Sequence, residues 1–516
     1  MRDAVAARER VALVAIFVVA LAVRLAYVLS IRDAVFFTYL QTEPLRYERW
    51  AAAILAGHAP APPFDEPPGY AYFLAAVHRV LGRSSTAVAL VQILLDAVTC
   101  ALVVVLGRRW FGARAGLVAG VLAAAYGPLV YFTGAVEPAT AFVCATMLAL
   151  AVQAAGWWIA GGLLWDLALL FRAEIVLAFP FALLDAARRG GRAAAARTAA
   201  PIVALVVLLA SVNWAHTGKV VAYITSGGLN FWAGNDPWAD GVNPFFSGPR
   251  AEVMREVAAR ARDASDADRL FLDRALAFWR AQPGTAVALT TKKVLWTLAD
   301  RELPNTGDIE WQEGQSALFR PWFLPLRFGL VLPLALVGAV APGRRWRELP
   351  LLTAPIVVAL VTAAVFFTNA RLRLVMMPSV LILAAVGAVE VVSRRWRPRD
   401  ALALAAGLVL AWGGFFGVRT YRIPEITVNT GILERQARHP AAAAALLRDG
   451  VAAAPDDALG WTHLARPKPR SPSICPLRKR LTSPSRREPR SPRFGPRPAR
   501  RSSSPPSRDS LSGTRS

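Results

Sequence analysis

The sequence predicts an all-α integral membrane protein with about eleven transmembrane helices. Of its 516 residues, 55% are hydrophobic and only 18% are charged, and the apolar residues form long uninterrupted blocks. The first block, residues 11–30, contains one charge, Arg24. Its length of about twenty residues matches a helix that crosses roughly 30 Å of hydrocarbon. No small-residue cleavage site follows, so we expect an uncleaved first helix.

Further apolar blocks follow along the chain, and we expect them to form helices. They comprise residues 86–106, 115–132, 139–155, 157–184, 199–214, 322–340, 351–367, 374–392 and 401–418. Basic clusters separate some of these blocks, at residues 108–114, 188–197, 344–347 and 394–399. Because Lys and Arg concentrate in cytoplasmic loops, these clusters indicate the cytoplasmic side of the membrane.

The block 157–184 cannot be one crossing, because a single crossing would place the basic cluster at 188–197 outside. Arg172 and Glu174 interrupt this block, and their charges are costly in lipid. We therefore predict two short crossings with a turn near Arg172. With a cytoplasmic N-terminus, this gives eleven crossings and an extracytoplasmic C-terminus. The outer loops are then residues 31–68, 133–138 and 216–321.

These boundaries divide the chain into five parts. We expect an N-terminal transmembrane catalytic module (1–214), an extracytoplasmic loop domain (215–321), C-terminal transmembrane helices (322–421), a partial helical repeat (422–465) and a disordered tail (466–516). The alanine-rich repeat segment contains Ala454-Pro455-Asp456-Asp457-Ala458, which resembles the join between two tetratricopeptide repeat units.

The tail differs abruptly in composition from the rest of the chain. It holds fifteen Lys or Arg, two acidic residues, eleven prolines and twelve serines, so it carries +13 of the net charge of +24. Such a segment cannot form a core. We interpret it as a frameshift product that replaces the rest of a repeat array. Because the remaining basic residues lie largely between apolar blocks, the high charge does not indicate a nucleic-acid partner. Three cysteines, Cys100, Cys144 and Cys475, provide no disulfide framework or cysteine metal site.

Polar residues that could carry chemistry gather in the outer loops. The first loop contains Glu43, Tyr47, Asp65, Glu66 and Tyr70. An aromatic belt at the headgroup boundary would produce a similar composition. Glu137 starts a later apolar block, where a carboxylate is also favourable to the helix dipole. Arg172, Arg371 and Arg373 lie at the expected outer boundary, where arginine can anchor a helix or clamp a phosphate.

Four segments give residues 11–421 a resemblance to the bacterial members of the GT-C membrane glycosyltransferases, which include the protein O-mannosyltransferases and the aminoarabinose transferase. They are Glu43 with Tyr47, the run Pro67–Ala75, Asn230-Phe-Trp-Ala-Gly-Asn235 with Ala239-Asp-Gly241, and Arg371-Leu-Arg373 with Pro378. The resemblance implies transfer of a sugar from a polyprenyl-phosphate donor to a protein, lipid or glycan acceptor at the outer face of the bacterial cytoplasmic (inner) membrane.

The resemblance also implies roles for individual residues. Glu43 becomes the candidate general base and Glu137 the second acid. This family most often has Asp at the first position, so Asp65 and Glu66 remain alternatives to Glu43. Arg172, Arg371 and Arg373 are expected to bind the donor phosphate, and Tyr47, Tyr70, Asn230 and Asn235 to bind substrate. No cofactor is certain, and the scattered carboxylates leave open whether a divalent metal takes part.

Two other functions compete with this one. A transporter or flippase of a lipid-linked sugar would need ionisable groups within the membrane, for which Arg24, Asp96 and Asp166 are the candidates. No inverted repeat is evident, which disfavours a transporter. An interaction scaffold would use the repeat region to recruit a partner, but ten or more crossings are excessive for an anchor.

Overall fold

A computed structural model describes residues 2–242, 245–305, 307–319, 326–341, 349–393, 397–455 and 457–465. Within these ranges the chain is helical, and its only extended pairings are two isolated bridges, Phe64 with Ile224 and Tyr126 with Leu326. The predicted all-α class is therefore confirmed. The predicted tail, from residue 466 onward, lies outside the described residues.

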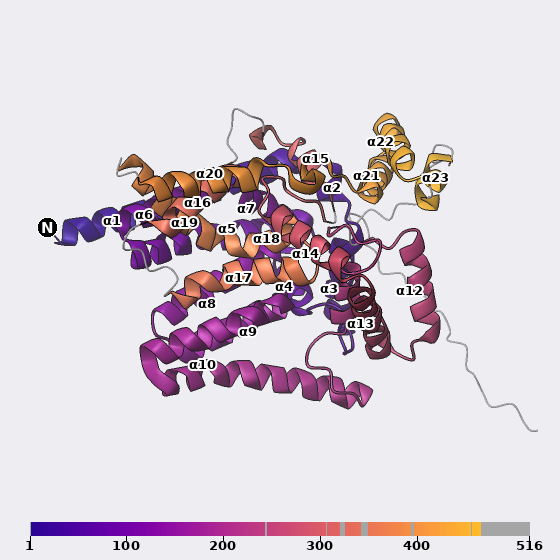
Figure 1. The fold of residues 1–516 in the computed structure, drawn as a ribbon, viewed down its shortest axis with the longest axis horizontal. Coiled ribbons are helices and arrows are strands. Elements are labelled where there is room, and N and C mark those ends of the chain that lie inside the picture. The colour runs from indigo at the N-terminus through magenta and orange to yellow at the C-terminus, as the bar shows by residue number, and fades with distance from the viewer. Residues whose placement is uncertain are drawn as a thin grey trace, which may run out of the picture. The chain divides into compact units, whose positions relative to one another are not determined.

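The helices follow one another along the chain (Figure 1). The N-terminal part contains α1 (Arg2–Ile31), α2 (Val35–Thr38), α3 (Thr42–Leu55), α4 (Gly69–Leu81), α5 (Ser85–Phe111), α6 (Ala113–Ala125), α7 (Gly127–Phe132), α8 (Ala139–Ala154), α9 (Trp158–Phe171), the 3-10 helix η1 (Ala173–Ala178) and α10 (Phe179–Thr217). The middle part contains α11 (Gly227–Ala233), α12 (Pro249–Arg260), α13 (Ala264–Ala281), α14 (Pro283–Thr297), α15 (Ile309–Glu313) and η2 (Ala317–Phe319).

The C-terminal part begins with α16 (Phe328–Val340) and α17 (Pro350–Val365). It continues with α18 (Ala370–Arg373), η4 (Leu374–Met376), α19 (Met377–Val392), α20 (Pro398–Trp412), η5 (Phe415–Thr420), α21 (Pro424–Gln436), α22 (Pro440–Ala453) and α23 (Ala458–Ala465). The last three form a helical hairpin with one further short helix: a Cβ on Gly431 would contact Leu447, and one on Gly450 would contact Val428, as in antiparallel helices. Their assignment to a tetratricopeptide repeat stays a prediction.

Four stretches among the described residues are long and apolar enough to cross a membrane: Glu9–Ile31, Ser85–Phe111, Ala173–Thr217 and Ala370–Val392. Pro398–Trp412 and Phe415–Gln436 pass the same test together but are bent by 41°. Five shorter apolar helices accompany them: α6, α8, α9, α16 and α17. These helices confirm a multi-pass membrane protein, whereas the number of eleven crossings stays a prediction.

Glycines bring the membrane helices close together. A Cβ on Gly338 of α16 would lie 2.0 Å from the Leu383 carbonyl oxygen of α19, and one on Gly387 of α19 would lie 1.9 Å from the Leu334 oxygen of α16. Helices in lipid gain little from hydrophobic association, so close backbone packing at small residues is a principal source of their contact.

Arg24 and Asp96, two of the candidates for a transport relay, form a buried ion pair. The Arg24 Nε atom donates to Asp96 at 2.6 Å, and its other nitrogens donate to the carbonyls of Ala123 and Ala124, where α6 ends. The side chain of Arg24 thereby joins α1, α5 and the end of α6, and replaces the hydrogen bonds that the helix break removes. This geometry gives both charges a structural role.

The predicted break at Arg172 is confirmed. The α9 helix ends at Phe171, and Arg172 has an extended backbone. The first part of α10 then returns along α9, since Arg189 donates to the Ala154 carbonyl and its guanidinium lies 5.4 Å from the Trp158 ring centroid. Gly191 then has φ 73°, a conformation that favours glycine, and α10 bends there before it continues to Thr217.

Candidate active site

Glu43 lies in the first turn of α3, where a carboxylate interacts favourably with the helix dipole. Its side chain is only 13% exposed, and its Oε2 atom accepts a hydrogen bond from Arg371 at 2.6 Å. The same guanidinium nitrogen lies 3.7 Å from Oε2 of Glu137, which is two residues before α8. Three segments that are far apart in sequence therefore meet around one arginine.

The local sequence explains how Arg371 reaches this position. Helix α17 ends at Val365, and Asn369 starts the short helix α18 by accepting a hydrogen bond from the Leu372 amide at 3.0 Å. Asn369 also donates to Asn305 at 3.0 Å, which ties this turn to the middle part of the chain. The run Asn369-Ala370-Arg371 thus consists of a helix cap followed two residues later by the arginine that reaches Glu43.

Two carboxyl groups near Arg371 differ in their protonation equilibria. Burial opposes ionisation of Glu43, but the Arg371 guanidinium outweighs it and lowers the pKa of Glu43 below its usual value. Glu66 responds in the opposite sense, because burial and the charge of Glu43 raise its pKa to about 7, even though Arg46 donates to it at 2.7 Å. Glu43 is therefore ionised at neutral pH, while Glu66 exchanges its proton near neutrality.

A cavity of about 470 Å³ lies beside this cluster. Its polar part contains the side chains of Tyr47, Glu66, Arg172, Glu174, Asn230 and Arg371. Its apolar part contains Val176 and Leu177 of η1, Val361 and Val365 of α17, and the two phenylalanines that follow α17. Of these apolar residues, Val176 is 50% exposed and Val365 is 37% exposed.

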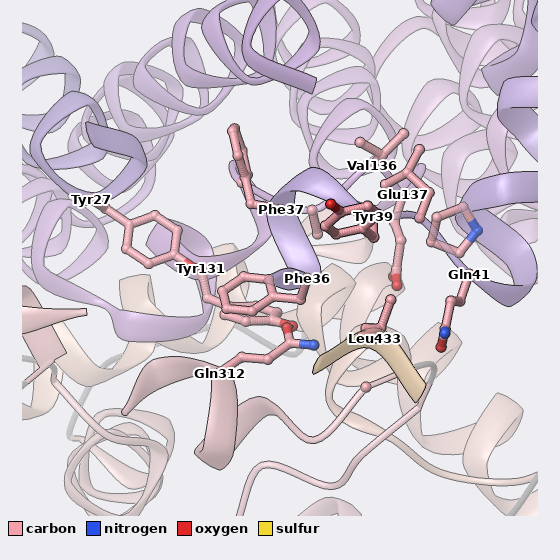
Figure 2. Close-up of a pocket in the computed structure, with 15 residues that line it drawn as sticks. Tyr27, Phe36, Phe37, Tyr39, Gln41, Tyr131, Val136, Glu137, Gln312 and Leu433 are labelled. Carbon is pink, nitrogen blue, oxygen red and sulfur yellow. The ribbon is translucent and has the colours of Figure 1, made fainter. Parts of the chain in front are cut away.

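A smaller pocket of about 70 Å³ lies on the Glu137 side of the cluster. Figure 2 shows Glu137 at one end of this pocket and Tyr27 with Tyr131 at the other. Gln41 and Pro44, which flank Glu43, also line it. The hydroxyl of Tyr131 is hydrogen-bonded to Gln312, whereas the buried Tyr27 hydroxyl has no hydrogen-bond partner among the described residues. The charged cluster thus has the large cavity on the Arg371 side and an aromatic pocket on the Glu137 side.

Several residues expected at the site lie elsewhere. Arg373 pairs with Glu302 and donates to the Ala299 carbonyl at 2.5 Å, away from the cavity lining. Tyr70 is buried beside Tyr47 and donates to Gln92 at 2.9 Å. Asn235 is fully buried and donates to the Val365 carbonyl at 2.6 Å. Of the predicted binding residues, Tyr47, Asn230, Arg172 and Arg371 line the large cavity.

Sequence reasoning missed two groups near the site. Arg46 lies one turn after Glu43 on α3 and pairs with both Glu66 and Asp65. Its helical spacing from Glu43 could have shown that they share a face. Lys293 is fully buried in α14 and lies outside the four motif segments that resemble the glycosyltransferases. A lone lysine in a helix carries no sequence signal for such a position.

Among the residues that the structure describes, no group of three or more His, Cys, Asp or Glu side chains is placed to hold a metal ion. The positive charge in the large cavity comes from Arg172 and Arg371. The Nε atom of Arg172 donates a hydrogen bond to Glu174, and the guanidinium lies 6.0 Å from the Phe142 ring centroid.

One family of known proteins matches part of the sequence. Residues 65–216 match the dolichyl-phosphate-mannose-protein mannosyltransferase family. Over this segment, the match bears out the resemblance to the protein mannosyltransferases. The matched segment contains Glu66, Tyr70, Glu137 and Arg172, whereas Glu43 and Arg371 lie outside it. No curated protein matches the sequence.

Solved structures of two proteins are also similar to the chain. The archaeal oligosaccharyltransferase AglB from Archaeoglobus fulgidus, in complex with an inhibitory peptide and a dolichol-phosphate, is 14% identical with a TM-score of 0.39. The match covers 90% of this chain and 60% of AglB. ArnT from Cupriavidus metallidurans, bound to undecaprenyl phosphate, is 14% identical with a TM-score of 0.34, and the match covers 74% of this chain and 78% of ArnT. The chain thus spans 60% of the length of AglB.

Proposed function

We propose that this protein transfers a sugar from a polyprenyl-phosphate donor to an acceptor on the extracytoplasmic face of a bacterial inner membrane. The large cavity carries this proposal, because its lining joins two arginines to partly exposed apolar side chains of η1 and α17. A polyprenyl phosphate has the same two parts, an anionic head and an apolar chain. The family match of residues 65–216 supports a donor of this class.

The arrangement suits general-base chemistry on a phosphate leaving group. Arg172 and Arg371 would neutralise the lipid phosphate as its bond to the sugar breaks. Arginine is well suited to this role, since its planar guanidinium can hold two phosphate oxygens at once. When Arg371 turns toward the phosphate, Glu43 loses its hydrogen bond to Arg371 and becomes a stronger proton acceptor.

We place the acceptor on the other side of the charged cluster. Its hydroxyl or amine would approach from the aromatic pocket, where Glu137 and the residues flanking Glu43 lie. Glu43 would take the acceptor proton, and Glu137 would act as the second acid that helps orient Arg371. In this arrangement, donor and acceptor meet from opposite sides of one carboxylate.

The experiment is transfer of radiolabelled sugar from a set of polyprenyl-phosphate sugars by the purified protein in lipid nanodiscs. We expect the Glu43→Gln protein to lose at least about a hundredfold in transfer rate, as removal of a general base does. The Asp33→Asn protein is the control, because Asp33 lies in the same outer loop with its side chain 90% exposed.

Full transfer by a folded Glu43→Gln protein would reject Glu43 as the base and direct attention to Glu66. Movement of a lipid-linked sugar across the membrane of proteoliposomes, without covalent transfer, would show that the protein is a flippase and not a glycosyltransferase. Glycolipid and glycoprotein mass spectrometry of cells with and without the gene would then identify the acceptor class.

A further inference from the structure

Lys293 is a fully buried lysine that the proposed chemistry does not use. It lies in α14, and its Nζ atom donates three hydrogen bonds, to the carbonyl of Phe366 at 2.9 Å, the carbonyl of Gly234 at 3.1 Å and Oδ1 of Asn235 at 3.3 Å. All three acceptors are neutral oxygens. Burying a charged lysine is costly, and here its three hydrogen bonds go to neutral groups and not to a carboxylate. Its position therefore calls for an explanation.

The acceptors of Lys293 show what it holds. Val365 is the last residue of α17, and Phe366 follows it, so the carbonyls there lack donors within the helix. Asn235 donates to the Val365 carbonyl at 2.6 Å, and Lys293 donates to the Phe366 carbonyl. Together they cap the C-terminus of α17, and a lysine is also favourable to the negative end of the helix dipole.

The packing around this cap leaves little freedom. A Cβ on Gly234 would lie 1.7 Å from the Phe366 carbonyl oxygen, so only glycine permits the observed approach. The Oδ1 atom of Asn235 also accepts from the Trp279 indole nitrogen at 3.1 Å, which fixes the amide orientation. Burial among neutral groups lowers the pKa of Lys293 to about 7, so the three-donor cap described here belongs to its protonated form.

The capped end of α17 leads directly into the large cavity, where we propose that the donor binds. Val365, Phe366 and Phe367 line its apolar part, and Arg371 follows five residues after the capped carbonyl of Phe366. The intervening backbone is held by the same outer part of the chain, since the Thr368 amide donates to the Gly241 carbonyl at 2.9 Å.

We infer that Lys293 is a positioning residue for the lipid-phosphate donor. By capping α17, it fixes the part of the cavity lining that contains Phe366 and the turn that presents Arg371. Lys293 does not touch the donor. Its contribution passes through the backbone of residues 366–371. This inference rests on the proposed function, because it assumes that the cavity takes the donor.

The test measures binding of undecaprenyl phosphate to the full-length protein in nanodiscs, together with its thermal unfolding midpoint. The Lys293→Met protein keeps the apolar stem but has no donor for three buried oxygens. We expect it to bind undecaprenyl phosphate at least about tenfold more weakly than wild type. The Lys293→Gln protein retains an amide with two donors, so we expect partial recovery of binding.

The neighbouring Lys292→Met change is the matched control. The Lys292 ammonium lies 4.3 Å from the Trp296 ring centroid, so its charge is directed to that ring, and we expect wild-type binding. If Lys293→Met does not accumulate in membranes, the comparison of Lys293→Gln with wild type decides the matter. In an active preparation, the defect should raise KM for the donor more than it lowers kcat.

Wild-type affinity in folded Lys293→Met or Lys293→Gln protein, beside a wild type that binds, would overturn only the role of Lys293. Weak binding by both variants in proportion to their lost donors supports it. A wild-type protein that does not bind undecaprenyl phosphate would overturn the proposed function and this inference with it.

Discussion

Glu43 and Arg371 are 328 positions apart in sequence, yet they share a hydrogen bond of 2.6 Å. Each residue would be expensive alone in its buried position, because an unpaired charge out of water loses its solvation. Together with Glu137 they form a cluster in which one guanidinium faces two carboxylates. Arg172 and Arg46 add positive charge near Glu43, and Glu66 adds a carboxyl group beside them.

Glu66 gives the site a pH dependence. Burial and the charge of Glu43 raise its pKa to about 7, so Glu66 is largely neutral at pH 6 and ionised at pH 8. Ionisation adds a negative charge to the cavity wall. We therefore expect the affinity for undecaprenyl phosphate to fall about fivefold between pH 6 and pH 8 as a result of this charge.

The measurement is a set of binding curves for wild-type and Glu66→Gln protein at both pH values. The lipid phosphate titrates near pH 6 itself, and this contribution is common to both proteins. The difference between them isolates Glu66. Identical pH profiles would show that Glu66 keeps the same protonation state throughout the range.

At the scale of single elements, the membrane helices are interrupted where the site is built. Helix α9 stops before Arg172, and α17 stops before the turn that carries Arg371. Non-helical backbone near a membrane is tolerated where it is buried in protein or lines a cavity, because its polar groups need partners. Both interruptions meet this condition, since each contributes residues to the large cavity.

The contact between α16 and α19 tests how closely the elements pack. In Gly387→Ala, the new Cβ would lie 1.9 Å from the Leu334 carbonyl oxygen, which is backbone and cannot move aside alone. We expect the two helices to separate, with a loss of about 1–3 kcal/mol of stability, as overpacking of a tight interface produces. The midpoint of thermal unfolding in detergent measures this loss.

Gly284→Ala provides the matched control. Gly284 lies in the first turn of α14, and a Cβ added there would have no described heavy atom within 4 Å outside its own helix turn. The same chemical change there should leave the midpoint near the wild-type value. Equal midpoints for the two variants would show that α16 and α19 do not approach as closely as described.

At the scale of the whole molecule, we expect the basic clusters to lie on the cytoplasmic side of the membrane and the candidate site to lie on the other side. The expected topology places the cluster at 188–197 in the cytoplasm and His216 outside, at the two ends of the second part of α10. Both Arg188 and His216 are exposed. These two positions, one on each side of the bend at Gly191, therefore give a direct test of orientation.

We expect a membrane-impermeant maleimide to label the His216→Cys protein in intact cells and the Arg188→Cys protein only after permeabilisation. Cys100, Cys144 and Cys475 are first replaced by serine, so that each protein carries one reactive thiol. The opposite labelling would invert the membrane orientation and place Glu43 and Arg371 on the cytoplasmic side. Labelling of both positions from outside would reject the predicted crossing.

The sequence alone determined the membrane class, the break at Arg172 and the resemblance to glycosyltransferases. These follow from local properties: the length of apolar runs, the cost of charge in lipid and the order of residues in short motifs. It also indicated Glu43, Glu137, Arg172 and Arg371, which lie beside each other or line one cavity.

Only the tertiary structure decided which motif residues reach the cavity. Asn230 and Asn235 belong to the same motif, yet Asn230 lines the cavity while Asn235 caps α17. Likewise, Arg371 meets Glu43 while Arg373 meets Glu302. Residues a few positions apart on short helices point in different directions, and their partners come from distant segments. The burial of Lys293 depends on the same long-range packing, which no local pattern records.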